Sequence, residues 1–202
     1  MNIAVFCSGS GTNLQAIIDA KKKGSIKGEL RLVLSDVPDC FALTRAKKAG
    51  VKTFVAERKD FQSKKDFEAE ILKKLKEEDI GLIVLAGFMR MLSADFVNEY
   101  KDKILNIHPA LLPAFKGTEG IQDAFSYGVK VTGPTVHFVT SEMDEGPIIL
   151  QFPIIIKEDD TIETLREAVH REEHKLYPRA IQLFVEGRLE IEGRRVRIKA
   201  RS

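Results

Sequence analysis

Two polar side chains stand at the end of an apolar run in the segment ILNIHPALLPAF, residues 104–115. Asn106 and His108 are two residues apart, so in a strand both would point to the same side of the sheet. An amide N–H and a protonated imidazole that converge on one point can stabilise a developing oxyanion. Pro109 then ends the strand, and a long loop is expected over residues 110–120. The pair therefore predicts an oxyanion-stabilising site at a strand tip.

A histidine at a strand end is also a common structural residue, and it is the neighbouring amide that favours a chemical role for His108. A nearby carboxylate would keep the imidazole charged near neutral pH. The turn-like segment SEMDEG offers Asp144 as the first candidate, with Glu142 and Glu145 as alternatives, and the sequence does not choose among them. His137, in the apolar run TVHFVT, is expected to pack in the core or behind the site.

A glycine-rich stretch, SGSGTNL at residues 8–14, follows the first predicted strand and opens the first predicted helix. Free backbone N–H groups and the helix dipole suit that position to an anion, and Thr12 and Asn13 add side-chain donors. The dinucleotide pattern G-x-G-x-x-G is only half met because Leu14 stands at the third glycine, and no P-loop Lys-Ser or Lys-Thr follows. The favoured ligand is a monophosphate; the alternative is a tight turn without a ligand.

The elements that would position these residues alternate along the first part of the chain. Strand-length apolar runs separated by helical patterns predict βαβ units with parallel strands. A helix is predicted over residues 64–78, capped by Ser63 and Asp66, and the run IGLIVLAG has no polar residue, as in the central strand of a parallel sheet. The expected class is α/β, with a doubly wound, mostly parallel sheet and a Rossmann-like N-terminal half.

The second part of the chain has a different pattern. TGPTVHFVT and GPIILQFPIII are β-rich runs, which predict antiparallel strands in the C-terminal half. A long helix is predicted from about Thr161, with a kink before Pro178. The segment LEIEGRRVRI, residues 189–198, predicts a hairpin.

Length and composition narrow the class of protein. The 202 residues suit a single domain, with a phosphate-binding half over 1–108 and a C-terminal half over 109–202. The 32 Lys and Arg nearly balance 30 Asp and Glu, so no nucleic-acid-binding face is predicted. No basic leader or membrane-length apolar run is seen, and a cytoplasmic protein with no membrane partner is expected. Cys7 and Cys40 form no metal or redox motif and are expected to be buried free thiols.

The segment HREEH, residues 170–174, fits the H-x-x-E-H pattern of a zinc-protease class, with two histidines on one helical face. A zinc site would need a third protein ligand, which the sequence does not identify, so no metal is predicted. The plainer interpretation is a solvated helix face with ion pairs. A third interpretation is that Glu173 reaches a substrate and holds its amine.

Five segments that occur in order over essentially the whole chain resemble the phosphoribosylglycinamide formyltransferase family: AVFCSGSGTNLQAII, VLAGFMRMLS, NIHPALLPAFKG, GPTVHFVTSEMDEGPIILQ and EEHKLYP. Methionyl-tRNA formyltransferases and formyltetrahydrofolate deformylases share the central block but normally carry an extra domain, which is not expected in 202 residues. The resemblance implies a formyltransferase-type fold, no metal, and transfer of a formyl group from 10-formyltetrahydrofolate to the amine of glycinamide ribonucleotide in purine biosynthesis.

The resemblance also implies residue roles. Asn106, His108 and Asp144 would be the catalytic trio. Gly11, Thr12 and Asn13 would hold the phosphate and ribose of glycinamide ribonucleotide, and Glu173 would lie near its amine. Met89 to Leu92 would form a wall of the folate pocket, Lys64 and Arg90 would meet the glutamate tail, and Thr140 to Asp144 would close the other side of the pterin. The donor-binding residues implied are Lys64, Met89, Arg90, Met91, Leu92, Asn106 and Thr140.

In the implied mechanism, the amine attacks the formyl carbon, and Asn106 and protonated His108 hold the oxygen that becomes negative. Asp144 would keep His108 charged and oriented, and nitrogen N10 of the folate would gain a proton through His108 or an ordered water. The stretch KGTEGIQDAF, residues 116–125, departs from relatives with a histidine there, so its conformation stays open. A non-catalytic phosphosugar sensor remains the alternative class, and the sequence leaves the oligomeric state open, a homodimer included.

Overall fold

The computed structural model describes residues 1–200, which form two compact units that divide between Leu105 and Asn106. The boundary falls within strand β5 (Ile104–His108). The fold class is α/β, with parallel strands in the first unit and mainly antiparallel pairing in the second, as the sequence predicts.

The first unit is built on four parallel strands in the order β4-β1-β2-β3: β1 (Asn2–Cys7), β2 (Glu29–Ser35), β3 (Lys52–Val55) and β4 (Ile80–Leu85). The β1 side chains from Ile3 to Cys7 are fully buried, and β4 is nearly so. Strands covered on both faces are apolar throughout because no side of them meets water. This confirms the parallel sheet predicted from the alternating runs.

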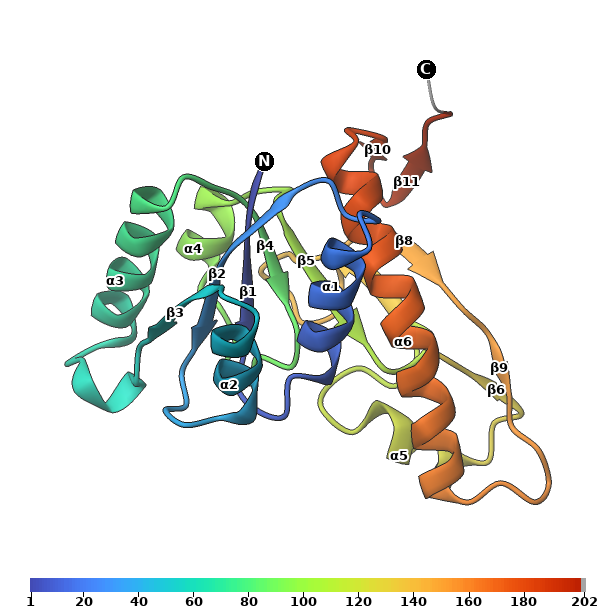
Figure 1. Cartoon of the computed structure of the whole chain (residues 1–202). Helices are drawn as coiled ribbons and strands as arrows, with labels where there is room; N and C mark the ends of the chain where they lie inside the picture. Colours follow the sequence, from blue (N-terminus) through green and yellow to red (C-terminus); the bar gives the residue numbers. More distant parts are fainter. Residues whose placement is uncertain (201–202) are drawn as a thin grey trace. The chain divides into compact units, whose positions relative to one another are not determined.

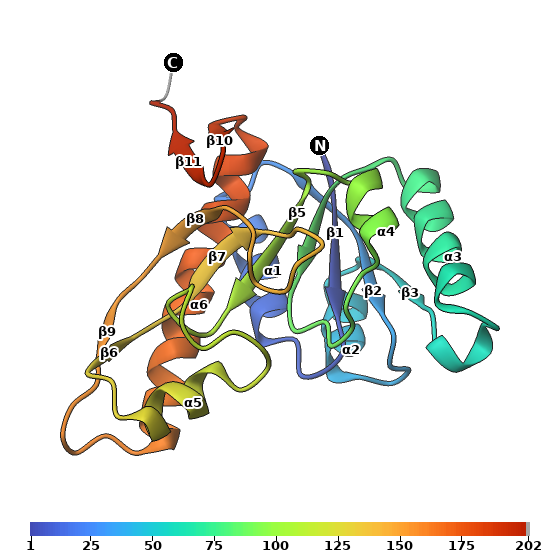
Figure 2. The ribbon, with the colours of Figure 1, turned by 180° about the vertical axis from the view of Figure 1, so that it is seen from behind.

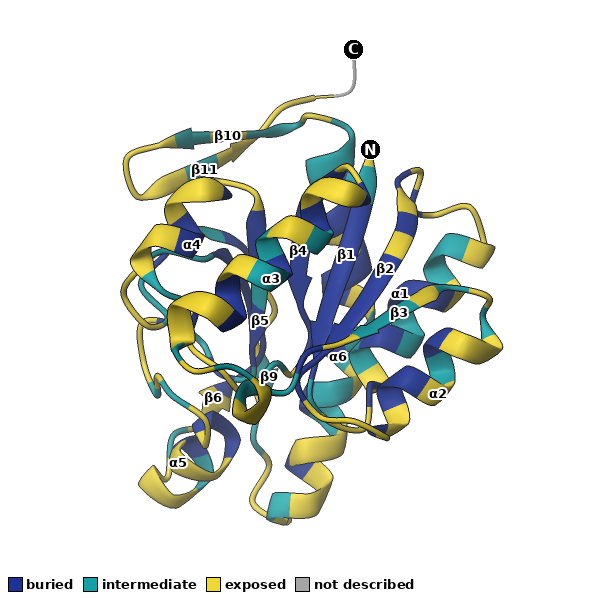
Figure 3. Cartoon of the chain, turned by 90° about the vertical axis from the view of Figure 1, so that its left-hand side faces the viewer, coloured by how far each residue is buried: buried dark blue, intermediate teal, exposed yellow. Residues whose placement is uncertain are grey.

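The helices of this unit cover both faces of its sheet: α1 (Thr12–Lys22), α2 (Phe41–Lys48), α3 (Lys64–Glu77) and α4 (Ala94–Glu99), with a 3₁₀ turn at Arg58–Asp60. Helices α1 and α2 lie on one face, and α3 and α4 on the other (Figure 1, Figure 3). The predicted capping box is present: the Ser63 hydroxyl accepts from the Asp66 N–H at 3.1 Å, and the Asp66 carboxylate accepts from the Ser63 N–H at 3.1 Å.

The second unit contains a shorter set of strands beside one long helix. β7 (Thr135–Phe138) pairs antiparallel with β8 (Ile148–Gln151), which also pairs with β11 (Arg195–Ile198) of the predicted hairpin. β10 (Leu189–Glu192) completes the hairpin, and β6 (Val131–Thr132) and β9 (Ile154–Ile155) form a separate pair. Helix α6 (Ile162–Val185), capped by Thr161, covers one face of β7 and β8 and continues through Pro178 (Figure 1, Figure 2).

One helix of the second unit was not predicted. Helix α5 (Gly120–Tyr127) begins where the sequence indicated the end of a loop, and it ends at Gly128, whose φ is +82°. Ile121 of α5 packs against Leu165 and Val169 of α6. A helix of eight residues is too short for a clear periodic pattern and depends on such packing, which the local sequence does not show.

Cys7 and Cys40 are buried free thiols, as predicted. Burial raises the pKa of the Cys7 thiol well above its usual value, so this thiol stays protonated. Over the described residues, no helix is both long enough and apolar enough to cross a bilayer.

Glu78, at the end of α3, forms ion pairs with basic side chains from three elements of the first unit. Its carboxylate lies 3.1 Å from Lys52 Nζ, 3.1 Å from Arg31 Nε and 3.5 Å from Lys74 Nζ. The hydrogen bond from Lys52, followed by that from Arg31, holds the pKa of Glu78 below its usual value, against the effect of burial. This carboxylate therefore ties β2, β3 and α3 together.

We expect the Glu78→Gln variant to lose stability at pH 7 and to become equal to the wild type in acid. Because the folded pKa is lowered, the stabilisation is complete above the unfolded pKa, about 4.3, and disappears as the pH falls through the folded pKa. Urea unfolding of both proteins between pH 7 and pH 3 measures the difference. An equal difference in the free energy of unfolding at every pH would contradict an electrostatic role.

Candidate active site

The glycine-rich loop of the first unit presents an uncapped helix start. Gly11 precedes α1 with φ +70° and has no side chain to occupy the free N–H groups, and the exposed Thr12 begins the helix. A Cβ on Gly11 would lie 2.7 Å from the Cα of Ala42, so only glycine allows α2 to pack this close. The first turn of α1 contains no acidic residue. Its N–H groups and helix dipole suit an anion, and phosphate binding by Gly11, Thr12 and Asn13 stays a prediction.

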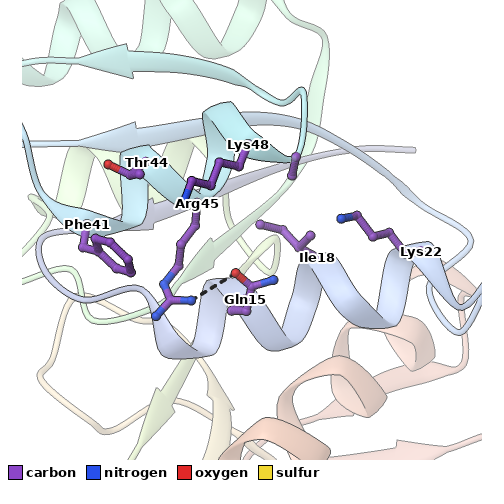
Figure 4. Close-up of a pocket in the computed structure, with 8 residues that line it drawn as sticks. Gln15, Ile18, Lys22, Phe41, Thr44, Arg45 and Lys48 are labelled. Atoms are coloured by element: carbon purple, nitrogen blue, oxygen red, sulfur yellow. Dashed lines mark hydrogen bonds between the residues drawn. The ribbon is translucent and has the colours of Figure 1, made fainter.

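A pocket between α1 and α2, of about 240 Å³, lies next to this loop (Figure 4). Arg45 extends from α2 to α1, where its guanidinium donates to the Gln15 side-chain oxygen at 3.1 Å and to the Ser10 carbonyl at 2.9 Å. The same guanidinium lies 4.6 Å from the centre of the Phe41 ring. Arg45 therefore holds the backbone of the glycine-rich loop, a role that the sequence did not indicate.

The predicted folate wall lines a second cavity of the first unit, of about 320 Å³, whose lining residues are Arg58, Lys64, Phe67, Met89, Arg90, Met91 and Leu92. Met89 and Met91 are large apolar side chains that are 68% and 52% exposed, which suits them to an apolar ring of a ligand. The structure thus brings Lys64 together with all four residues of the predicted wall. Arg58 is a cation at this cavity that sequence reasoning missed, because its position there depends on the 3₁₀ turn before α3.

Arg90 lines the same cavity as Lys64, so its contact with a glutamate tail stays a prediction, and it also makes a contact inside the protein. Its Nε lies 2.5 Å from the Asp36 carboxylate, so at least part of its charge is already paired inside the protein. Asp36 also accepts from the Ser8 hydroxyl at 2.6 Å, and that hydroxyl accepts from the Met89 N–H at 3.0 Å. The sequence analysis named neither Asp36 nor Ser8 as a site residue.

In the second unit, His108 of the strand tip lies beside the predicted acid, and Asn106 contacts a second histidine. Asp144 lies with one carboxylate oxygen 3.5 Å from His108 Nδ1 and the other 3.6 Å from His137 Nε2. The Asn106 amide nitrogen is 3.2 Å from the same His137 nitrogen. Both histidines are buried, and Asn106 is half-buried. The cluster therefore contains Asn106, His108, His137 and Asp144, of which His137 was expected only to pack.

The geometry fixes the protonation pattern of His137. Its Nδ1 lies 2.8 Å from the Phe138 carbonyl oxygen, which can only accept, so Nδ1 carries a proton. Burial, against the smaller effects of that hydrogen bond and of Asp144, lowers the pKa of His137, so the ring is neutral near pH 7. Its bare Nε2 must then accept from Asn106, which turns the amide nitrogen toward His137 and leaves its second N–H to donate elsewhere.

Of the three acids in SEMDEG, Asp144 is the one that a tight turn places beside His108. Asp144 has φ +54°, and a Cβ on Gly146 would lie 1.7 Å from the Phe138 carbonyl oxygen, so the chain reverses sharply here. The Gly117 N–H donates to the Asp144 carboxylate at 2.9 Å. Glu145 instead pairs with Lys116, on the exposed side of the turn. Asp144 is therefore the acid beside His108.

The loop after β5 covers the other nitrogen of His108. Nε2 lies 2.7 Å from the carbonyl oxygen of Phe115, a residue with φ +52°, so Nε2–H donates to the chain. A Cβ on Gly120 would stand 3.2 Å from this nitrogen, which explains a small residue at the start of α5. Both ring nitrogens of His108 thus face acceptor oxygens.

The remaining predicted residues of this unit lie on α6 and in the turn. Glu173 is buried, and its carboxylate is hydrogen-bonded to His170 Nδ1 at 2.9 Å. Thr140 is half-buried and donates to the Glu142 carbonyl at 3.3 Å. Within residues 1–200, no group of three or more His, Cys, Asp or Glu side chains is arranged to hold a metal ion.

The sequence and the fold were compared with those of known proteins. Residues 1–181 match the formyl transferase family. The chain is 42% identical over 191 residues to phosphoribosylglycinamide formyltransferase of Escherichia coli (strain K12), covering 95% of this chain and 90% of that protein. It is 44% identical to the trifunctional purine biosynthetic protein adenosine-3 of Gallus gallus, covering 95% of this chain but spanning only 19% of that longer relative.

Among solved structures, glycinamide ribonucleotide transformylase 1 from Symbiobacterium toebii is similar, with a TM-score of 0.95 and 48% identity. The match covers 98% of this chain and 93% of that one. Similarity of this extent in both sequence and fold shows that the chain belongs to the phosphoribosylglycinamide formyltransferase family.

Proposed function

We propose that this protein transfers the formyl group of 10-formyltetrahydrofolate to the amine of N1-(5-phospho-D-ribosyl)glycinamide, giving formylglycinamide ribonucleotide and tetrahydrofolate in purine biosynthesis. The observation that carries the proposal is the buried pairing of Asp144 with His108 in one cluster with Asn106. Family membership supports a folate-based donor. We assign the phosphate and donor contacts to residues of the first unit, and the catalytic groups to residues of the second.

The Asn106 amide would stabilise the oxygen that becomes negative when the amine attacks the formyl carbon. One of its N–H groups is committed to neutral His137, and this contact fixes the orientation of the other. A donor that is already oriented needs no reorganisation when charge develops, which is the main advantage of a preformed oxyanion site. His137 is therefore assigned a positioning role for Asn106.

His108 would be the second donor to this oxygen. Its Nδ1 faces Asp144 and its Nε2–H donates to the Phe115 carbonyl. In the proposed reaction, Nε2–H exchanges this carbonyl for the substrate oxygen, so the loop that contains Phe115 must move aside. Overall the attacking nitrogen loses one proton and N10 of the folate gains one, and we assign the relay between them to His108 with Asp144.

The cavity of the first unit suits the donor. Met89 and Met91 would pack against the pterin or the adjoining ring, and Arg58 and Lys64 provide cations for the carboxylates of the glutamate tail. Gly11, Thr12 and Asn13 would hold the phosphate of the acceptor, and Glu173 its amine. Thr140 remains a proposed contact for the pterin.

The proposed reaction is tested by following the loss of 10-formyltetrahydrofolate with one acceptor at a time. We expect loss with glycinamide ribonucleotide and none with initiator methionyl-tRNA or with water alone, because only the ribonucleotide has a phosphate monoester and an amine on one small sugar. A chelator present throughout would stop a zinc hydrolase built on His170 and His174. Turnover with water or tRNA alone would reject the proposed acceptor, and ligand binding without any turnover would favour a phosphosugar sensor.

Asp144→Asn is expected to lower kcat by about two to three orders of magnitude, the usual cost of losing an oriented charge-stabilising group. Its neighbour Glu145 is the matched control, since Glu145→Gln changes the same turn but only surface pairs, with Lys116 and Arg194. Steady-state kinetics with glycinamide ribonucleotide compares the two variants. Equal kcat values for Asp144→Asn and the wild type would refute the role of this carboxylate.

Lys64→Met is expected to raise the KM for 10-formyltetrahydrofolate roughly tenfold, as the loss of one charge-assisted hydrogen bond would. The same variant should have an unchanged KM for a donor analogue that lacks the glutamate tail. Lys65→Met is the control, because Lys65 is exposed on the same helix and does not line the cavity. An equal rise for both donors would show that Lys64 does not recognise the tail.

A further inference from the structure

Asp36 follows directly after β2 and is only 7% exposed. Each of its carboxylate oxygens accepts a short hydrogen bond: Oδ1 from the Ser8 hydroxyl at 2.6 Å, and Oδ2 from Arg90 Nε at 2.5 Å. A buried carboxylate needs such partners, because an unpaired charge away from water is costly. Both partners belong to segments proposed to bind substrates, Ser8 to the glycine-rich loop and Arg90 to the folate wall.

Ser8 joins the same two segments a second time. Its hydroxyl accepts from the Met89 N–H at 3.0 Å while it donates to Asp36, and its own N–H donates to the Gly87 carbonyl at 3.0 Å. Asp36, Ser8 and residues 87–90 therefore form a closed ring of hydrogen bonds within the first unit. We call this ring the Asp36 clamp.

The clamp acts where regular structure has ended. Gly11 and Gly87 both have positive φ, and Met89 is 68% exposed, so neither the loop nor the wall is held by a strand ladder at these points. Beyond the ends of β1 and β4, one backbone hydrogen bond, from Ser8 to Gly87, still joins the two segments, and the other bonds between them involve the side chains of Ser8, Asp36 and Arg90. Asp36 is the charged group that bonds to both segments.

The position of Asp36 indicates a change of role within this type of fold. In dinucleotide-binding sheets, an acid about 20 residues beyond the glycine-rich turn accepts from a ribose hydroxyl of the ligand. Here the oxygens of Asp36 accept from the protein's own serine and arginine instead. The carboxylate of Asp36 thus binds groups of the protein that hold the site in place, and not the ligand.

We infer that Asp36 is a positioning residue that fixes the phosphate loop and the folate wall to each other, so that one carboxylate determines the affinity for both substrates. This inference rests on the proposed function. Asp36 would touch neither ligand, and its effect would pass through Ser8 on one side and through Arg90 and the Met89 backbone on the other.

The test is Asp36→Asn, which keeps the shape of the side chain but removes the charge. We expect the Kd of glycinamide ribonucleotide and the Kd of tetrahydrofolate, each measured alone by titration calorimetry, both to rise about tenfold, the factor for one hydrogen bond to a charged group. Glu78→Gln is the matched control: it also removes a carboxylate that binds an arginine in this unit, and it should leave both Kd values unchanged.

Ser8→Ala provides a second variant that opens the clamp but keeps the pair of Asp36 with Arg90. If both substitutions act through the clamp, the double variant should weaken binding by less than the product of the two single effects. This variant also keeps the inference testable if Asp36→Asn does not fold.

The outcomes separate the inference from the proposed function. Unchanged Kd values in Asp36→Asn, with a melting temperature lowered as in Glu78→Gln, would overturn the inference and leave Asp36 a structural residue. A change for tetrahydrofolate alone would also overturn it, because Asp36 would then act only on the wall. Wild-type protein that binds neither compound would reject the proposed function itself, before any variant is compared.

Discussion

The carboxylate of Asp144 is the group around which the second unit is arranged. It is removed from most of the solvent, and it is stabilised there by the Gly117 N–H at 2.9 Å and by His108 Nδ1 at 3.5 Å. A carboxylate in such a place costs free energy unless its lone pairs are used, so the surrounding chain must bring donors to it. The left-handed conformation of Asp144 and the glycine at 146 follow from that requirement.

The loop after β5 also supplies hydrogen-bond partners to this cluster. It returns toward the strand tip so that the Gly117 N–H reaches Asp144 and the Phe115 carbonyl reaches His108. The positive φ of Phe115 is a backbone cost that this return imposes. Helix α5 then starts at Gly120 because a larger residue would crowd His108. One buried charge thus accounts for a turn, a loop conformation and a helix start that lie far apart in the sequence.

The first unit uses buried acids in the same way. Glu68 accepts from the Ser93 N–H at 2.8 Å and so connects α3 to the start of α4, next to the folate wall. Asp36 does this for the wall and the glycine-rich loop. Buried ion pairs contribute little net stability when compared with apolar packing, so a conformational role explains them better than a stabilising one. Both units are therefore apolar sheets whose ligand-facing edges are set by a few carboxylates.

The sequence predicted the features that depend on residues close together in the chain and missed those that depend on distant residues. The apolar runs of β1 and β4, the cap at Ser63 and the start of α6 near Thr161 depend on neighbours within a few residues, and all were predicted. Asn106 and His108 were found because alternation within one strand places them together. The contacts of Asp36, Arg58 and His137 were not predicted, because their neighbours lie up to 54 residues away along the chain, beyond any local pattern. The pairing of Arg90 with Asp36 was not predicted, because the two residues lie 54 positions apart in the sequence.

The choice of acceptor is a separate question from the chemistry of transfer. A cluster of amide, imidazole and carboxylate can stabilise the oxyanion formed when any amine, or water, attacks a formyl group, so the cluster alone does not define the substrate. The uncapped start of α1 does distinguish acceptors, because N–H groups and a helix dipole favour one that carries an anion. Gly11 makes that site and also allows α2 to approach to within contact of the loop. If this loop holds the acceptor phosphate as proposed, selection for a phosphorylated acceptor would be built into the packing of the first unit, because a substitution at Gly11 would displace α2 as well as alter the site.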